Sequence, residues 1–415
     1  MTSISRRSFL KGTLAAYAAS SISNSAPASD GQATTATALR PRCITMWDFS
    51  WIERRWSGAG FEDWPQALDG LVERGYDAVR IDAFPHLVGT APEKEWTLVP
   101  VWSVNDWGSP ALNRVRIQPG LNEFIGLCKK RNIKVGLSTW FREDIEKTRD
   151  RITSAQVMGE MWNDTLVGIA KAGLLDSLLY VDLCNEWPGD MWCPFFHNDP
   201  PELTWGGWYT EKSQQWMRAA CEIVRGRFPG VPTGFSFDLR DRGKLVNQNL
   251  EYLDYADPHI WMSQANNEEF YRLVGYKYDK FTPDSYRALV EKGEALYRSK
   301  PDYWHGLLRR YVLGTAKAFE PHHLPLMTTE CWALVDFKDW PLLNWNWIKD
   351  LCLTGVETAA STGQWLAIGT SNFAAPQFRG MWSDVRWHRE ANDVTKRSVI
   401  RPELLQTRLG LRLRA

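Results

Sequence analysis

The sequence has no excess of charge of either sign. Its 415 residues include 49 Lys and Arg and 49 Asp and Glu, which gives a formal net charge of zero. Nucleic acids and anionic membranes are bound through a basic face, so we expect neither as the main partner. With 44% hydrophobic residues, the chain is long enough for one large core. Either one α/β barrel with long loops or two domains would fit this length.

Long apolar segments and metal-binding spacings are also missing. No segment has the length to cross a bilayer, so the sequence predicts no membrane span. The seven Cys include no CxxC pair and the His residues are scattered, so we expect no metal site. The GxSxG, Walker A, GxGxxG and HExxH motifs are absent, and no cofactor is expected.

The N-terminus carries an export pattern. Residues 5–11, Ser-Arg-Arg-Ser-Phe-Leu-Lys, are typical of a twin-arginine signal, and a short apolar stretch runs from Leu14 to Ile22. Ala26-Pro27-Ala28 offers a small-residue cleavage site. We therefore predict a signal peptide over residues 1–28, a flexible lead-in over 29–40 and a periplasmic or extracellular location.

Strand-like and helix-like segments alternate over the rest of the chain, which indicates a parallel sheet covered by helices. The helix-like stretch Ser285–Glu320 is long enough for two helices. The sequence predicts a single (β/α)₈ TIM barrel over residues 41–415, with long loops at Phe84–Gly120, Pro188–Tyr209 and Met262–Ser285. The candidate strands are Cys43–Trp47, Ala78–Ile81, Lys134–Thr139, Leu178–Leu183, Thr233–Phe237, Pro258–Trp261, Pro325–Thr329 and Trp365–Gly369. The candidate helices are Phe61–Arg74, Leu121–Lys130, Ser154–Ala172, Glu211–Phe228 and Leu342–Leu353.

Two glutamates follow predicted strands. Glu186 ends the apolar run that begins at Leu178, and Glu330 ends the run that begins at Leu324. Residues at the C-terminal ends of barrel strands converge on one face, so these carboxylates are expected to meet. Two facing carboxylates are the minimum equipment for cleaving a glycosidic bond.

Three polar residues near these strand ends are further candidates. Arg80 lies within a strand, where it either keeps Glu330 ionised and lowers its pKa, or forms a structural salt bridge with Asp48 or Asp82. His259 is either a satisfied core residue or part of the site. Asn185 offers a donor and an acceptor for a sugar hydroxyl.

The chain also holds 23 Trp, an unusual number. Single tryptophans are expected in the core, but indole faces in loops also suit the apolar face of a sugar ring. The tryptophans in probable loops include Trp102, Trp107, Trp192, Trp205 and Trp208. Among the cysteines, Cys184 and Cys193 are the nearest pair for a disulfide in an exported chain. The favoured alternative is that Cys184 and Cys331 are small wall residues beside the glutamates.

Together, the Asn185-Glu186 pair, Glu330, Arg80 and His259 resemble the clan of retaining (β/α)₈ glycoside hydrolases that includes the cellulases. The chain from Ile44 onward, with Trp47 and Asp48 as candidate support residues, resembles the cellulase-like proteins of that clan over roughly residues 43–390.

The resemblance implies a role for each residue. Glu186 would be the acid/base and Glu330 the nucleophile, with Arg80 and His259 supporting them. Asn185 would bind the sugar 2-hydroxyl, and Trp365 would be a stacking platform on the last strand. Trp261 stands where the clan has a Tyr whose hydroxyl bonds the nucleophile, and we hypothesise that its indole N–H replaces that bond.

The sequence therefore predicts an exported retaining β-glycoside hydrolase with a carbohydrate substrate, acting on an oligo- or polysaccharide by double displacement. The alternative is a non-catalytic carbohydrate-binding barrel, which the Tyr-to-Trp difference favours. A binding isotherm without product formation would distinguish the two. No oligomeric state is predicted.

Overall fold

The computed structural model describes residues 39–103, 105–197, 207–240, 242–277, 282–334, 338–339 and 341–414. The predicted signal peptide, most of the lead-in and Trp205 lie outside these residues. Over the described part of the chain, no helix has the combination of length and apolarity that crossing a membrane requires.

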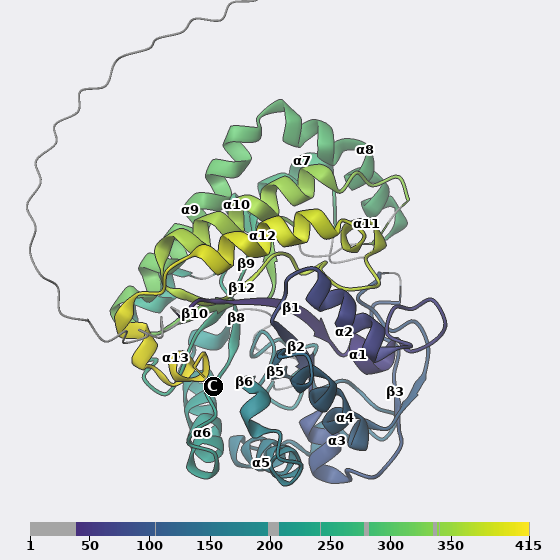
Figure 1. Ribbon diagram of the computed structural model, residues 1–415, viewed down its shortest axis with the longest axis vertical. Coiled ribbons are helices and arrows are strands. Elements are labelled where there is room, and N and C mark those ends of the chain that lie inside the picture. The colour runs from purple at the N-terminus through teal and green to yellow at the C-terminus, as the bar shows by residue number, and fades with distance from the viewer. Residues whose placement is uncertain are drawn as a thin grey trace, which may run out of the picture. The chain divides into compact units, whose positions relative to one another are not determined.

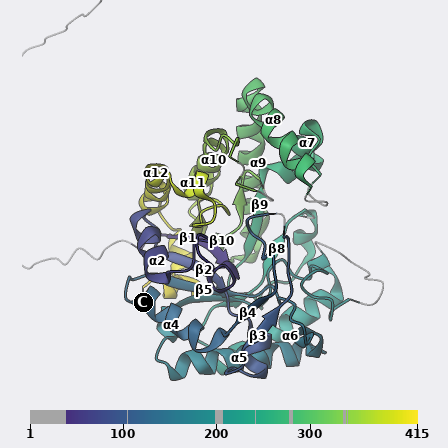
Figure 2. The ribbon, with the colours of Figure 1, turned by 90° about the vertical axis from the view of Figure 1, so that its right-hand side faces the viewer.

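Parallel strands form the centre of the described domain (Figures 1 and 2). Each predicted strand segment contains an observed strand, and one of them, Thr233–Phe237, is split into two strands, while a further short strand follows the segment Pro325–Thr329. In one sheet the order is β10 (Leu326–Thr328), β12 (Trp365–Gly369), β1 (Arg42–Asp48), β2 (Ala78–Asp82), β5 (Lys134–Ser138), β6 (Leu178–Asp182) and β7 (Thr233–Gly234). A second parallel sheet has the order β11 (Cys331–Trp332), β9 (Asp257–Trp261) and β8 (Ser236–Asp238).

The prediction of a parallel α/β architecture is therefore confirmed, whereas the paired strands form a seven-stranded and a three-stranded sheet instead of one closed ring. A parallel bridge between Ala256 and Leu326 lies between the two sheets. The long segment after β2 contains a feature that the sequence did not predict, an antiparallel pair of β3 (Trp96–Leu98) and β4 (Asn113–Val115).

Helices cover the outside of the strands (Figure 1). The stretch predicted as two helices is α8 (Pro283–Ser299) and α9 (Pro301–Phe319). The prediction for 342–353 ended too early, because α10 runs over Asn346–Thr362 and keeps burying residues as far as Ala360. The other long helices are α2 (Trp64–Glu73), α4 (Ile117–Lys129), α5 (Ala155–Lys171), α6 (Glu211–Arg227), α7 (Ala265–Val274) and α12 (Val385–Arg397).

Local sequence sets several of these helix ends. The side chain of Asp63 accepts a hydrogen bond from the Gln66 amide at the start of α2, and Ser154 does the same for Val157 at the start of α5. Gly75, the predicted C-cap of α2, has φ +84°, which a residue with a side chain adopts at a cost. These caps explain why both helices were predicted within a few residues.

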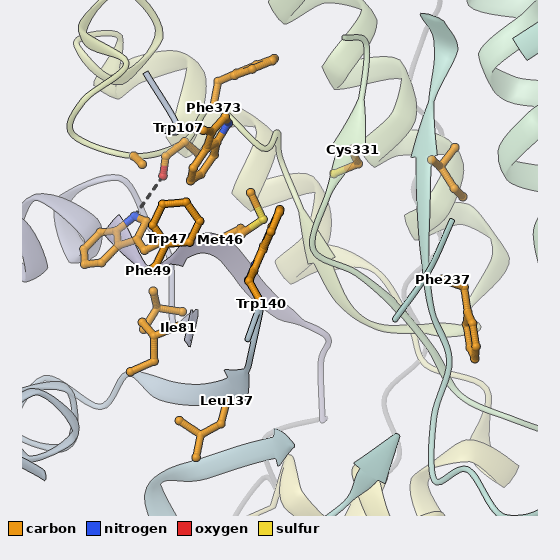
Figure 3. Close-up of a cluster of buried hydrophobic side chains, with 14 of the residues drawn as sticks. Met46, Trp47, Phe49, Ile81, Trp107, Leu137, Trp140, Phe237, Cys331 and Phe373 are labelled. Atoms are coloured by element: carbon orange, nitrogen blue, oxygen red, sulfur yellow. Dashed lines mark hydrogen bonds between the residues drawn. The ribbon is translucent and has the colours of Figure 1, made fainter. Parts of the chain in front are cut away.

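The core consists of two clusters of buried side chains. The larger one includes Trp47, Phe49, Ile81, Leu137 and Trp140, which Figure 3 shows near the ends of neighbouring strands. The smaller cluster brings strand residues together with apolar residues of the C-terminal segments η8 (Pro402–Gln406) and α13 (Arg408–Arg412). Its members are Ile44, Ala78, Leu179, Tyr180, Tyr255, Met327, Leu366, Ala367, Ile400, Leu404, Leu409 and Leu413.

Strand alternation separates these clusters and positions the polar residues. On β2, Val79 and Ile81 belong to the larger cluster, whereas Ala78 belongs to the smaller one. Arg80 and Asp82 share the face of Ala78 because successive side chains alternate. That face is therefore apolar near the start of the strand and charged near its C-terminal end.

Candidate active site

The structure brings the two predicted glutamates together. Glu186 follows β6, and Glu330 lies between β10 and β11. Their exposed fractions are 6% and 5%, so both carboxylates are largely withdrawn from water. One carboxylate oxygen of each and a ring nitrogen of His259 all lie within 4.8 Å of one another. This spacing is short enough for both carboxylates to contact one sugar residue.

Arg80 is fully buried and binds several of the other candidates. Its Nε donates to Asp48 Oδ1 at 2.9 Å, and its Nη2 donates to Glu330 Oε1 at 3.1 Å. It also donates to the side-chain oxygens of Asn185 and Thr329. Both sequence-based interpretations of Arg80 are therefore represented, since it pairs with Asp48 and with Glu330. Each bond offsets part of the cost of burying the guanidinium.

Asp82, the other proposed partner of Arg80, is used differently. Its carboxylate accepts hydrogen bonds from the backbone amides of Phe84, at 2.7 Å, and Trp140, at 2.9 Å. Asp82 therefore organises the turns that follow β2 and β5.

His259 is held in one tautomer by Arg80. Its Nε2 lies 3.3 Å from Nη1 of Arg80, and because a guanidinium has no acceptor, this nitrogen must be unprotonated. The ring proton is then on Nδ1, which donates to Glu186 Oε1 at 2.8 Å and lies 3.6 Å from Glu330 Oε2. Burial lowers the pKa of His259 to about 4, so the ring is neutral at pH 7. Of its two interpretations, the structure places His259 in the site.

Burial also shifts both carboxyl groups. It raises the pKa of Glu186 to about 8, and the charge of Asp238 adds to this shift. For Glu330, burial and the nearby Glu186 raise the pKa well above its ordinary value, and Arg80 opposes them. The expectation that Arg80 gives Glu330 a lowered pKa is therefore wrong, because desolvation outweighs the cation. Among the described ion pairs, Arg80 contacts Glu330 and not Glu186, so the negative charge is better supported on Glu330.

Asn185 presents an unused donor. Its Oδ1 accepts a hydrogen bond from Arg80 and lies 3.5 Å from Ser236 Oγ, and its backbone amide donates to the carbonyl of Thr139, just after β5. Its Nδ2 is buried and has no hydrogen-bond partner among the described residues. A buried amide left in this state costs free energy unless a ligand accepts its hydrogen bond.

Trp261 does not make the bond that the sequence suggested. The residue is 1% exposed, and its ring packs edge-on against His259 with centroids 5.5 Å apart. Its indole N–H has no hydrogen-bond partner in the described part of the chain. The hypothesis that this group donates to Glu330 is therefore not supported by the structure.

Two other predicted residues are not brought to the glutamates. Trp365 is the first residue of β12, whereas the site lies where strands end, and its ring contacts Trp332. Trp47 lies in the core (Figure 3). Its N–H donates to the Ala374 carbonyl at 3.3 Å, and its ring centroid is 5.1 Å from that of Phe61. Both were assigned from their position in the sequence, which does not define the direction of a side chain.

Most of the loop tryptophans are packed inside the protein. Trp107, Trp192 and Trp208 are buried, and Trp102 is partly exposed. Trp102 and Trp192 form an edge-to-face cluster with Trp140, with ring centroids 4.5–5.3 Å apart. Packing therefore accounts for most of these residues, and Trp102 is the one with a partly open surface.

Several polar residues of the site were missed by the sequence analysis. Thr329 Oγ1 donates to Asp257 Oδ2 at 2.7 Å, so it connects Asp257 to Arg80. Ser236 Oγ accepts from the backbone amide of Glu186 at 2.9 Å and donates to Asp182.

Asp238, at the end of β8, is 2% exposed and pairs with Arg240 at 2.8 Å. Side chains two positions apart on a strand point to the same face. The sequence could therefore have indicated that Asp257 shares a face with His259, and that Asp238 shares a face with Ser236.

The grouping of Glu186, His259 and Glu330 could in principle hold a cation. A metal ion would need the lone pair of His259 Nδ1, but the tautomer fixed by Arg80 puts a proton there. The arrangement fits hydrogen bonding to a hydroxylated ligand better than metal coordination.

Known proteins resemble this chain over most of its length. The model of a cellulase-like family, described as sugar-binding cellulase-like, matches residues 44–396. A crystal structure from Parabacteroides distasonis ATCC 8503, provisionally described as a glycoside hydrolase, is 49% identical with a TM-score of 0.87. The match covers 90% of this chain and 99% of that chain.

More distant likenesses include a GH5_18 protein from Streptomyces cattleya in complex with GlcNAc, with 14% identity, a TM-score of 0.46 and coverage of 88% and 83%. None of the curated proteins compared with the chain is significantly similar to it.

Proposed function

The chain belongs to the cellulase-like family, and from that premise we propose that it is an exported retaining β-glycoside hydrolase acting on an oligo- or polysaccharide. The observation that carries the proposal is the closeness of Glu186 and Glu330, whose carboxylate oxygens lie within 4.8 Å. Retaining enzymes hold their two carboxyl groups about 5–5.5 Å apart, whereas inverting enzymes leave about 6.5–9.5 Å for a water molecule. The spacing supports double displacement.

In the first step, Glu186 protonates the leaving oxygen while Glu330 attacks the anomeric carbon and the glycosidic bond breaks. Because burial raises its pKa to about 8, Glu186 is still protonated near neutral pH and can supply this proton. Arg80 stabilises the ionised form of Glu330 through its 3.1 Å hydrogen bond.

In the second step, Glu186 is a carboxylate and removes a proton from water, which attacks the glycosyl-enzyme and releases Glu330. The hydrogen bond from His259 Nδ1 stabilises Glu186 in this ionised form. The unused Nδ2 of Asn185 is available to a sugar hydroxyl, which supports its assignment to the 2-hydroxyl.

We further propose that the two sheets make up one (β/α)₈ barrel. Only Phe235 separates β7 from β8, and only Thr329 and Glu330 separate β10 from β11. If β7 and β8 are counted as one strand, and β10 and β11 as another, each strand of the two sheets pairs in parallel with the next, and β12 pairs with β1. In such a barrel the C-terminal strand ends form the active face.

Azide rescue tests the mechanism. Hydrolysis by Glu186→Ala should fall far more for substrates with poor leaving groups than for dinitrophenyl β-glycosides, whose leaving group needs no proton. The glycosyl-enzyme should accumulate, and azide should restore turnover to give the β-glycosyl azide. With Glu330→Ala, hydrolysis should be lost for every substrate, and azide should instead produce the α-azide.

The product anomers are read by NMR across a panel of sugars, with Glu222→Ala, an exposed residue of α6, as the matched control. Swapped anomers would reverse the two roles. An initial wild-type product of opposite anomeric configuration would mean inversion and overturn the proposal. Glycan binding without any product would favour the alternative, a carbohydrate-binding barrel, which the unpartnered N–H of Trp261 also favours.

A further inference from the structure

Two cysteine side chains meet directly beside the acid/base residue. Cys184 lies two positions before Glu186, and its Sγ is 3.3 Å from Sγ of Cys193. Both residues are completely buried. We propose that Cys184 and Cys193 form a disulfide when the protein folds in an oxidising compartment. This proposal requires no glycosidase activity, so the two can fail independently.

The backbone already brings Cys193 back over Cys184. The amide of Gly189 donates to the Glu186 carbonyl at 2.8 Å, and the amide of Cys193 donates to the Gly189 carbonyl at 2.9 Å. These bonds form two consecutive turns after the strand. A disulfide has an S–S length of about 2.05 Å, so the sulfur atoms must approach by only about 1 Å.

The other cysteines have different surroundings. Cys43 Sγ donates to the Asn392 carbonyl at 3.4 Å, and Cys331 Sγ donates to the Gly369 carbonyl at 3.5 Å. All seven cysteines belong to the described part of the chain, and among their hydrogen bonds there only the Cys184–Cys193 contact joins two sulfur atoms. The alternative role of Cys331, as a small wall residue beside Glu330, fits its surroundings.

The oxidation requires a disulfide oxidant such as glutathione disulfide. One protein thiolate attacks the oxidant and releases one glutathione thiol. The second protein thiolate then attacks the mixed disulfide and releases the other glutathione thiol. The protein loses two protons and two electrons, and the oxidant is reduced to two thiols. Because the folded protein buries both sulfurs, we expect the exchange to occur while the chain folds.

The bond would close a ring that contains Asn185, Glu186 and Trp187. The next segment of the chain would then be attached covalently to the strand end that supplies the acid/base. Such a ring removes conformations from the unfolded chain, but the effect is modest because the ring is short. We expect reduction to lower Tm by roughly 2–5 °C.

Mass spectrometry tests the proposal on the full chain. The protein is isolated from an oxidising compartment, denatured, alkylated without reduction and digested with trypsin. No Lys or Arg lies between Lys171 and Lys212, so one peptide holds Cys184 and Cys193 and no other cysteine. It should be unalkylated and about 2 Da lighter than the dithiol form. Reduction before alkylation should add two alkyl groups.

A second arm refolds the reduced protein in a mixture of reduced and oxidised glutathione, so that the result does not depend on export. In Cys193→Ser, Cys184 should become alkylated without reduction. In the matched control Cys221→Ser, which changes a buried cysteine of α6, the cross-link should persist. If both arms yield a peptide alkylated twice without reduction, or one carrying glutathione, the proposal is wrong.

Discussion

At the level of single residues, Arg80 links side chains that reach the site from several strands. It contacts Asp48 from β1, Asn185 after β6 and Glu330 after β10, and it fixes the tautomer of His259. A lysine at this position would offer a point charge without the fork of donors that these contacts use. The charge and proton positions of the glutamates therefore depend on a residue that need not touch the substrate.

The pKa of Glu186 predicts the alkaline side of the pH profile. In the proposed mechanism Glu186 acts as an acid and must be protonated, and because burial raises its pKa to about 8, kcat/KM should fall as the pH rises through about 8. On the acidic side, Glu330 must be ionised, and its raised pKa places that limb above the ordinary range for glutamate. Because the two carboxyl groups lie close together, the two apparent pKa values of the pH profile belong to the pair and not to either residue alone.

The measurement is kcat/KM against pH with dinitrophenyl glycosides and with natural glycans. Glu186→Gln should remove the alkaline limb for the activated substrate. Asp238→Asn should move that limb to lower pH in the otherwise native enzyme, because Asp238 raises the pKa of Glu186. An alkaline limb that persists unchanged in Glu186→Gln would show that another group supplies the proton.

The indole N–H of Trp261 gives a second prediction at this scale. Because this buried donor has no described partner, Trp261→Phe should leave the free energy of unfolding unchanged or raise it by up to about 1 kcal/mol. The value of kcat should change by less than about threefold, since no bond to Glu330 is lost. Calorimetry and steady-state kinetics provide the two measurements.

Trp51→Phe is the matched control, because the N–H of Trp51 donates to the Asp82 carbonyl at 2.9 Å. Its loss should destabilise the fold by about 1–3 kcal/mol. A fall in kcat of more than about tenfold for Trp261→Phe at constant KM would instead show that its N–H acts in the transition state.

At the level of elements, neighbouring strands fit together through glycine. A Cβ added at Gly136 of β5 would overlap the ring of Tyr180 on β6, and the same relation holds more loosely between Gly234 and Tyr255. The two tyrosine rings pack against each other with centroids 5.1 Å apart. Glycines on one strand thus make room for tyrosines on the next strand or just before it.

Gly136→Ala should therefore destabilise the protein by about 1–3 kcal/mol in urea unfolding, through overpacking. Adding Tyr180→Leu should recover part of this loss, because the obstructing ring is gone. Gly126→Ala on α4 is the control, since nothing lies within 4 Å of its added Cβ, and it should be neutral or stabilising. Equal effects of the two alanine variants would contradict the packing argument.

At the level of the whole molecule, the N-terminal export signal remains a prediction from the sequence. Replacing Arg6 and Arg7 by Lys should leave the precursor in the cytoplasm, because the twin-arginine route recognises that pair. Fractionation of cells followed by immunoblotting measures the outcome. Unchanged export of the double variant would refute this route. A control that carries only Glu330→Ala should be exported as the wild type is.

The sequence by itself determined the order of the parallel strands, most of the long helices and the positions of both glutamates, but α7 lies in a segment predicted as a loop and α12 was not predicted. The predicted features depend on local signals: apolar runs for strands, capping residues for helices, and a carboxylate where a run stops. It did not reveal the β3–β4 pair or the full length of α10, because neither has a clean local period.

The tertiary structure decided which side chains share the site. Trp47 and Trp365 looked suitable by position, yet one lies in the core and the other at the opposite end of its strand. Only the fold places Arg80 against His259, and this contact sets the tautomer. The upward pKa shift of Glu330 likewise depends on burial, which is a property of every element packed around it. A local pattern can name a charged residue, but its electrostatic environment comes from atoms far away in the chain.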